Sequence, residues 1–157
     1  MYINYLCAAA LLLNAACQNT GKPATPAAEA TARSPIDGAW ELVENRVDGK
    51  LVNPKRPQQL KIFHDGFFSF MHLDPDGSFH GSGAGTYTLD GNRYRETFRY
   101  YSDTTWVDYA DEQTWELRGD TLLFAGFKKV FDRSGKQMPA DAWGGDKFEE
   151  KRVRAKP

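Results

Sequence analysis

A β-hairpin between residues 85 and 101 is the sequence feature that most constrains the fold of this chain. Asp90-Gly91 separates two runs that are rich in Thr, Tyr and Phe, and Asp-Gly favours the two-residue turn of an antiparallel hairpin. A type I′ turn at this dipeptide predicts that Tyr87 lies opposite Tyr94. Because side chains alternate along a strand, one face of the hairpin is apolar and the other is polar.

The apolar face of this hairpin is predicted to line the interior of the protein. It carries Tyr87, Leu89, Tyr94, Phe98 and Tyr100, with Glu96 among them. A buried carboxylate has to be hydrogen-bonded, paired or protonated. Glu96 could therefore hold an amine or hydroxyl group of a ligand, or act as a general base. The alternatives are a structural pair with an inward Arg or with Tyr hydroxyls, and exposure at the mouth of a barrel.

The segment from residue 36 to residue 157 reads as a series of short strands. Turn signals recur about every 10–15 residues, the spacing of an antiparallel meander. Strands are expected at 38–43, 59–63, 67–73, 79–89, 92–101, 114–118, 121–130 and 147–153. About eight strands joined by tight turns can close into an up-and-down barrel, which removes the exposed edges. The predicted fold class is all-β, an antiparallel barrel of eight strands, or up to about ten.

The N-terminus reads as a targeting segment. Leu6 to Leu13 is an apolar run too short to span a bilayer, and small residues precede Cys17 as in a bacterial lipoprotein signal. This predicts a signal peptide over 1–16, lipidation of Cys17, a flexible Ala/Thr/Pro tether over 17–35 and a domain over 36–157. The expected location is the periplasm or the outer membrane. An ordinary secretory signal cleaved nearby is the alternative.

The first expected strand and the hairpin carry a family resemblance. Gly38-Ala39-Trp40 matches the Gly-x-Trp signature of lipocalins, and residues 83–91 and 94–97 add to the likeness. The domain resembles the lipocalin-like domains of small secreted proteins and lipoproteins of the Bacteroidetes type. The resemblance implies a small barrel with an interior pocket, and an Arg from the last strand packed on Trp40. Arg152 is the first candidate for that Arg, and Arg154 is the second.

The composition excludes several classes of function. The net charge is −1, which gives no electrostatic basis for binding nucleic acid or an anionic membrane surface. A membrane contact is therefore expected through the lipid anchor only. Cys7 and Cys17 are the two cysteines, so the domain is expected to have no disulfide and no thiol chemistry. No cofactor is predicted, and no nucleophilic or paired-carboxylate motif indicates an enzyme.

His72 and His80 could form a metal-binding pair. The intervening loop suits a type I turn with a glycine bulge, which sets the two imidazoles against each other. The same register places both on the outer face of the sheet, whereas Met71 points inward. A bulge within residues 81–85 would reverse these faces. Two surface histidines near a hairpin tip are therefore the favoured interpretation, and a metal site is the alternative.

The sequence predicts a non-enzymatic protein that binds a small hydrophobic or amphipathic ligand inside the barrel. The candidate ligand-binding residues are Met71, Tyr87, Tyr94, Glu96, Phe98, Tyr100 and Trp115. A barrel of this size either holds one small ligand or is filled by its own side chains. An envelope lipoprotein that acts through its outer surface is therefore the alternative. A barrel enzyme with Glu96 as general base is a third hypothesis.

Overall fold

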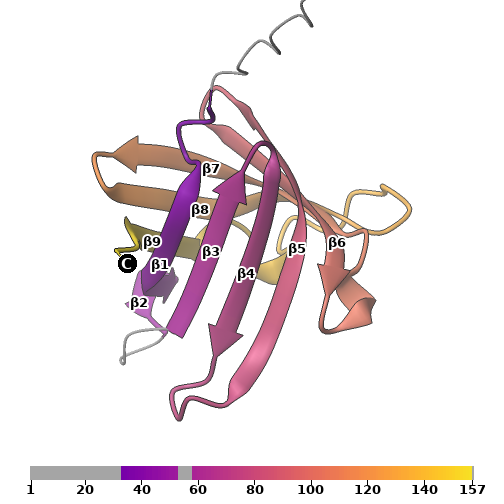
Figure 1. Cartoon of the computed structure of the whole chain (residues 1–157). Coiled ribbons are helices and arrows are strands. Elements are labelled where there is room, and N and C mark those ends of the chain that lie inside the picture. The colour runs from indigo at the N-terminus through magenta and orange to yellow at the C-terminus, as the bar shows by residue number, and fades with distance from the viewer. Residues whose placement is uncertain (1–32, 53–57, 157) are drawn as a thin grey trace, which may run out of the picture. The chain divides into compact units, whose positions relative to one another are not determined.

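The computed structural model describes residues 33–52 and 58–156, and these residues form an antiparallel β-barrel (Figure 1). The strands are β1 (Gly38–Val47), β2 (Lys50–Leu51), β3 (Gln58–His64), β4 (Phe67–Leu73), β5 (Phe79–Asp90), β6 (Arg93–Tyr101), β7 (Ala110–Arg118), β8 (Thr121–Phe131) and β9 (Phe148–Arg154). Two short 3₁₀ helices, η1 (Thr104–Trp106) and η2 (Ala142–Lys147), lie in the connections. The predicted signal peptide, Cys17 and the predicted tether up to residue 32 lie outside the described residues.

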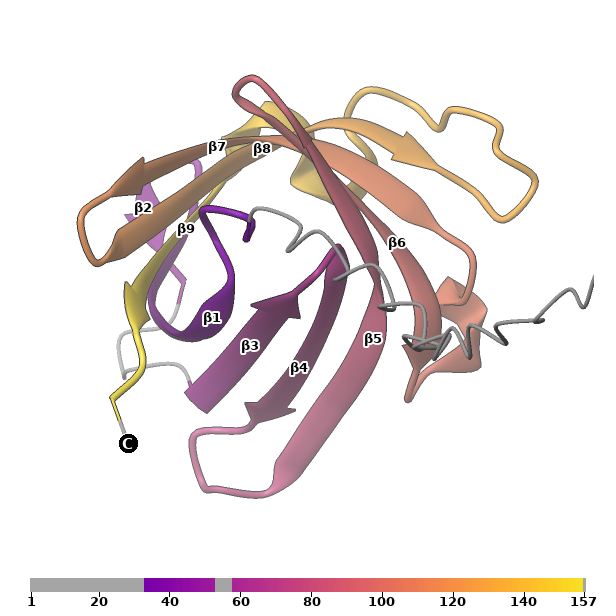
Figure 2. The ribbon, with the colours of Figure 1, turned by 45° about the horizontal axis from the view of Figure 1, so that its top comes forward.

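The order of the strands closes the sheet on itself. The sheet runs β2-β1-β3-β4-β5-β6-β7-β8-β9, and β1 also pairs with β9. Figure 2 shows the strands curving around a common interior. Eight strands, β1 and β3 to β9, therefore form the barrel wall, and the predicted all-β up-and-down barrel is confirmed. Among the described residues, no helix has the length and apolar character required to cross a membrane.

The β5–β6 hairpin forms with a register that differs from the predicted one. Asp90 pairs with Arg93, and Tyr87 lies opposite Glu96 rather than Tyr94. The turn residues are Gly91 and Asn92, and Gly91 has a φ of 58°, as the first central position of a type II′ turn requires. The pairing is displaced by two residues. Because an even displacement keeps each side chain on its face, the predicted apolar face still points inward up to Phe98.

A bulge in β6 reverses the orientation of the residues that follow Phe98. Gly85 pairs with Phe98 and Ala84 pairs with Tyr100, so Arg99 is an extra residue. A Cβ atom on Gly85 would lie 1.9 Å from the carbonyl oxygen of Thr97, which is why this close approach requires glycine. The prediction that Tyr100 points inward is wrong, because the bulge leaves Tyr100 75% exposed and turns Tyr101 inward instead.

A second bulge sets the orientation of β4. Leu73 pairs with Phe79 and His72 pairs with Gly81, so His80 is the extra residue. This bulge lies one residue before residues 81–85, where the sequence analysis considered a bulge. It reverses the predicted inward and outward sides of β4. Met71 is therefore exposed, with 51% of its surface accessible, and its predicted inward position is wrong.

One end of the barrel, where β1 begins and β9 ends, is filled with side chains; we call it the closed end. Its core consists of Ile36, Trp40, Phe63, Phe68, Tyr87, Tyr94, Phe98, Leu122 and Phe124. Phe63 contacts Tyr87 and Tyr94 edge to face, with ring centroids 5.2 and 6.0 Å apart, a favoured arrangement for aromatic rings. Seven of these nine core residues are aromatic.

Trp40 is fully buried in this core. Its indole N–H donates a hydrogen bond to the carbonyl oxygen of Ile36 at 2.7 Å. The guanidinium of Arg154 lies over the indole ring, 4.3 Å from its centroid. The Arg that packs on Trp40 is therefore Arg154, and the choice of Arg152 is wrong. Arg154 pairs directly with Trp40 in the β1–β9 ladder, whereas Arg152 lies opposite Leu42.

Candidate ligand-binding site

The opposite end of the barrel contains a cavity of about 380 Å³. Its lining includes Gln59 at the start of β3, His72 at the end of β4, Gly81 at the start of β5 and Tyr101 at the end of β6. The volume is within the usual range for small-molecule sites. The barrel is therefore filled at one end and hollow at the other.

The floor of the cavity, where it meets the closed-end core, contains a buried ion pair. The ammonium of Lys61 lies 2.5 Å from Oε2 of Glu96, and the hydroxyl of Tyr94 donates a hydrogen bond to the same oxygen. The side chains of Lys61 and Glu96 are only 9% and 5% exposed. The Lys61 ammonium also lies 4.6 Å from the centroid of the Phe68 ring, a cation–π distance.

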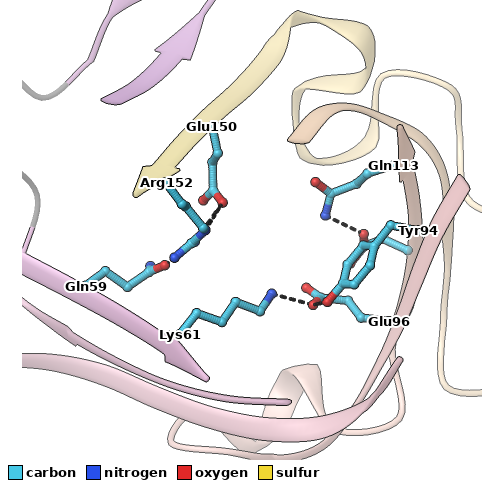
Figure 3. Close-up of polar contacts among 8 residues, drawn as sticks. Gln59, Lys61, Tyr94, Glu96, Gln113, Glu150 and Arg152 are labelled. Carbon is cyan, nitrogen blue, oxygen red and sulfur yellow. Dashed lines mark hydrogen bonds and ion pairs between the residues drawn. The ribbon is translucent and has the colours of Figure 1, made fainter. Parts of the chain in front are cut away.

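Arg152, on β9, supplies a second buried cation near Gln59 of β3 (Figure 3). Its Nε and Nη2 donate to Oε2 of Glu150 at 2.9 and 2.7 Å, and Nη2 also donates to the side-chain oxygen of Gln59. The Arg152 side chain is 2% exposed. The floor therefore carries two cations, each with its own carboxylate partner.

Asp111 is a fully buried carboxyl that lies directly across the β6–β7 ladder from Glu96. Burial raises the pKa of Asp111 well above its usual value, and the nearby charge of Glu96 raises this pKa further. The side-chain amide of Gln113 donates a hydrogen bond to Oδ1 of Asp111 at 2.8 Å. Of two adjacent carboxyl groups, Glu96 is thus paired with a cation, and Asp111 is held toward its neutral form.

The mouth of the cavity is lined by aromatic side chains. They are Phe70, Tyr101, Trp106, Phe127, Trp143 and Phe148, together with Phe98, which also belongs to the closed-end core. Trp143 lies at their centre, with its ring centroid 5.4 Å from those of both Trp106 and Phe127. The cavity is therefore amphipathic, with a polar floor and an aromatic mouth.

The loop before β9 places Trp143 at the mouth. Trp143 has a left-handed backbone conformation with a φ of 54°, and Gly144 and Gly145 continue with positive φ values. Glycine accepts such values without steric cost, whereas a tryptophan rarely adopts them. The sequence indicated only a connection between the expected strands at 121–130 and 147–153, and gave no role to Trp143.

His72 and His80 lie together, with ring centroids 4.6 Å apart. Both line the cavity, so their predicted position on the outer face is wrong. The bulge at His80 between β4 and β5 reverses the predicted orientation. Burial lowers the pKa of His72, and the adjacent His80 contributes to the lowering. Nδ1 of His80 lies 3.0 Å from a carboxylate oxygen of Asp74. Among the described residues, no group of three or more His, Cys, Asp or Glu side chains could hold a metal ion.

The predicted ligand-binding residues divide between several places. Glu96 and Phe98 line the cavity. Tyr87 and Tyr94 belong to the closed-end core, and burial raises the pKa of Tyr87 to about 12. Trp115 borders a separate hollow that is also lined by residues of β8 and β9. Contact of any of these residues with a ligand stays a prediction.

Sequence reasoning missed most of the polar floor. Lys61 is the charge partner that a buried Glu96 requires. The alternation of β3 could have indicated it, because Phe63 is a large apolar residue that points inward and Lys61, two residues earlier, lies on the same face. Asp111 and Gln113 were missed because the strand was expected to begin at Thr114, whereas β7 begins at Ala110. A strand extended by four residues would have placed both side chains opposite the inward face of β6.

The raised pKa of Asp111 predicts a specific pH dependence of stability. A carboxyl whose pKa is higher in the folded state binds its proton more tightly when folded, so the free energy of unfolding falls as pH rises above about 4. Asp111→Asn removes this titration. We therefore expect the stability of the variant relative to the natural protein to increase steadily from about pH 4 upward. Urea unfolding of both proteins at several pH values measures this difference, and a difference that does not change with pH would contradict the assignment.

Comparison with known structures supports the fold. A crystal structure of a lipocalin-like protein from Bacteroides uniformis matches with a TM-score of 0.51 and 14% sequence identity, over 76% of this chain and 98% of that chain. A crystal structure of an uncharacterized protein from Bacteroides eggerthii matches with a TM-score of 0.49 and 12% identity, over the same shares. No protein-family model matches the chain, and no curated protein sequence matches it significantly. The fold is lipocalin-like, as the resemblance in the sequence indicated.

Proposed function

We propose that this protein binds a small amphipathic molecule in the cavity at the hollow end of the barrel. The observation that carries this proposal is the division of the 380 Å³ cavity into a polar floor and an aromatic mouth. An amphipathic molecule can match both parts when its polar group is on the floor and its apolar body lies among the rings of Trp106, Trp143 and Phe127. A lipocalin-like barrel is a suitable scaffold, because an eight-stranded barrel can enclose one small ligand.

The contacts of Glu96 favour binding over catalysis. Oε2 of Glu96 accepts hydrogen bonds from both Lys61 and Tyr94. A general base accepts the substrate proton on a carboxylate oxygen, and on Glu96 one of the two oxygens, Oε2, is already held by a cation and a hydroxyl. The pair instead gives the cavity a fixed polar floor.

The cellular location belongs to the same proposal. We expect export through the signal peptide over 1–16 and lipid attachment at Cys17, which would make the protein a periplasmic or outer-membrane lipoprotein. The tether expected over 17–35 would link the lipid anchor to the barrel. The support is the sequence of the N-terminal segment.

Native mass spectrometry of the protein purified from its own source tests both parts. We expect the mass of a lipidated mature chain that begins at Cys17, together with an added small molecule that is released on gentle activation. Gly81 lines the cavity, and Ser82 is the next residue of β5 and points to the other face. Gly81→Leu should therefore remove the small molecule, whereas Ser82→Leu should retain it. An unmodified chain would contradict the anchoring. A wild-type protein without a bound molecule would contradict the binding role.

A further inference from the structure

Three buried side chains on the cavity wall each carry a polar atom without a hydrogen-bond partner among the described residues. These atoms are Nη1 of Arg152, Oδ2 of Asp111 and Oε1 of Gln113. The residues are 2%, 0% and 6% exposed, and all three line the cavity. Buried polar atoms in folded proteins are nearly always hydrogen-bonded. Three such atoms around one cavity are available to bond to a molecule that enters it.

The remaining atoms of the same side chains are held in place by the protein. Nε and Nη2 of Arg152 are bonded to Glu150 and Gln59, and Oδ1 of Asp111 accepts the bond from Gln113. The unpartnered atoms therefore occupy fixed positions. Figure 3 shows Gln113 of β7 and Arg152 of β9 directed into the interior. Such a preorganised set of polar groups is what gives a binding site its specificity.

The charges of the floor are already balanced. Lys61 is paired with Glu96, and Arg152 is paired with Glu150. Burial holds the Asp111 carboxyl toward its neutral form. A charged group placed here would have no unpaired counter-charge, and burying an unpaired charge is strongly unfavourable. The floor therefore favours a polar group without net charge.

The hydrogen-bonding roles of the three atoms differ. Arg152 Nη1 donates and requires an acceptor. Oδ1 of Asp111 already accepts from Gln113, so a protonated Asp111 would donate through Oδ2 and would also require an acceptor. Gln113 Oε1 accepts and requires a donor. A complementary group must therefore combine an acceptor with a neighbouring donor. An amide or a lactam edge has this combination.

We propose that the ligand is an uncharged molecule whose amide-like edge, with an acceptor beside a donor, contacts Arg152, Asp111 and Gln113 while a flat apolar ring lies among the aromatic side chains of the mouth. This inference rests on the proposed function and specifies the chemical class that the cavity selects. The indole N–H of Trp143, which also has no partner among the described residues, offers the ring side of the ligand one further donor.

Four probes with the same ring and different polar groups test the inference. They are 2-naphthamide, 2-naphthoate, 2-naphthylmethylammonium and naphthalene, each titrated into the full-length protein at pH 7 by calorimetry and by tryptophan fluorescence. We expect 2-naphthamide to bind at least about tenfold more tightly than each of the other three, because it alone satisfies the three atoms without adding a charge.

Substitutions of floor residues then test whether the floor causes the preference for 2-naphthamide. Gln113→Met keeps the length of the side chain and removes its amide, so 2-naphthamide should lose about tenfold in affinity and naphthalene should be unaffected. Arg152→Lys is the second variant and should reduce the same preference. Glu112→Gln, on the outer face beside Gln113, is the control and should leave all four affinities unchanged. Thermal unfolding confirms that each variant is folded.

The outcomes separate this inference from the proposed function. If naphthalene or a charged probe binds as tightly as 2-naphthamide, or if Gln113→Met leaves the preference intact, the ligand class is wrong while the cavity still binds small molecules. If none of the four probes binds and the tryptophan fluorescence does not change, both the ligand class and the proposed function are wrong.

Discussion

Replacing Lys61 with methionine should lower the free energy of unfolding by about 3–5 kcal/mol, the usual cost of leaving one member of a buried ion pair without its partner. The Glu96 carboxylate is only 5% exposed, and Lys61 is the cation that neutralises it. Methionine fills a similar volume but supplies no charge. Urea unfolding at pH 7, followed by circular dichroism, measures the loss.

A double substitution shows whether the loss comes from charge or from packing. Lys61→Met with Glu96→Gln removes both charges and keeps an acceptor for the hydroxyl of Tyr94. We expect the double variant to be clearly more stable than Lys61→Met alone, because no buried charge is left unpaired. A double variant that is less stable than either single variant would show that the pair contributes through packing.

Replacing Trp40 with alanine should cost about 3–5 kcal/mol of unfolding free energy, the usual range for a large aromatic residue lost from a core. Trp40 is completely buried, its indole N–H is bonded to Ile36, and Arg154 covers its ring. The substitution removes all three contacts and opens a cavity at the closed end of the barrel. Thermal and urea unfolding measure the effect.

Trp106→Ala is the matched control for this prediction. Trp106 lines the mouth of the cavity and is only partly buried, so its loss removes less apolar surface from the folded state. We expect a clearly smaller destabilisation and a reduced affinity for an aromatic probe. Equal losses of stability at the two positions would argue against a barrel that is filled at one end and hollow at the other.

The strand pattern and the barrel class could be predicted because they depend on local rules. Asp-Gly and other turn signals mark where strands end, and alternation marks which residues share a face. The inward face of β6 was predicted even though its register was displaced by two residues, because the period of a strand is two. Tyr94, Glu96 and Phe98 are accordingly buried.

The errors in side-chain orientation arise where one extra residue enters a ladder. Arg99 and His80 are such residues, and each reverses every side chain beyond it. Tyr100 and Met71 were misplaced for this reason, and so were the two histidines. The position of a bulge depends on close packing between strands, such as that of Gly85 against Thr97. A single sequence does not specify this packing.

The partners of Glu96 could not be found from the hairpin alone. Lys61 is 35 residues away in the sequence, and Asp111 belongs to a strand whose first half contains mostly polar residues. Their convergence depends on closure of the sheet between strands that are distant in sequence. The polar floor is therefore a product of the complete barrel rather than of any local motif.

Because the closed-end core and the cavity lie at different ends of the barrel, their residues can change separately during evolution. Side chains around the mouth, such as Trp106 and Phe127, can be exchanged with little effect on the packing around Trp40. Ligand preference can therefore diverge between related barrels while the fold persists. The Lys61–Glu96 pair lies where the two ends meet, and substitutions there affect folding and binding together. Variation among related barrels is expected to be greatest at the mouth and least at this pair.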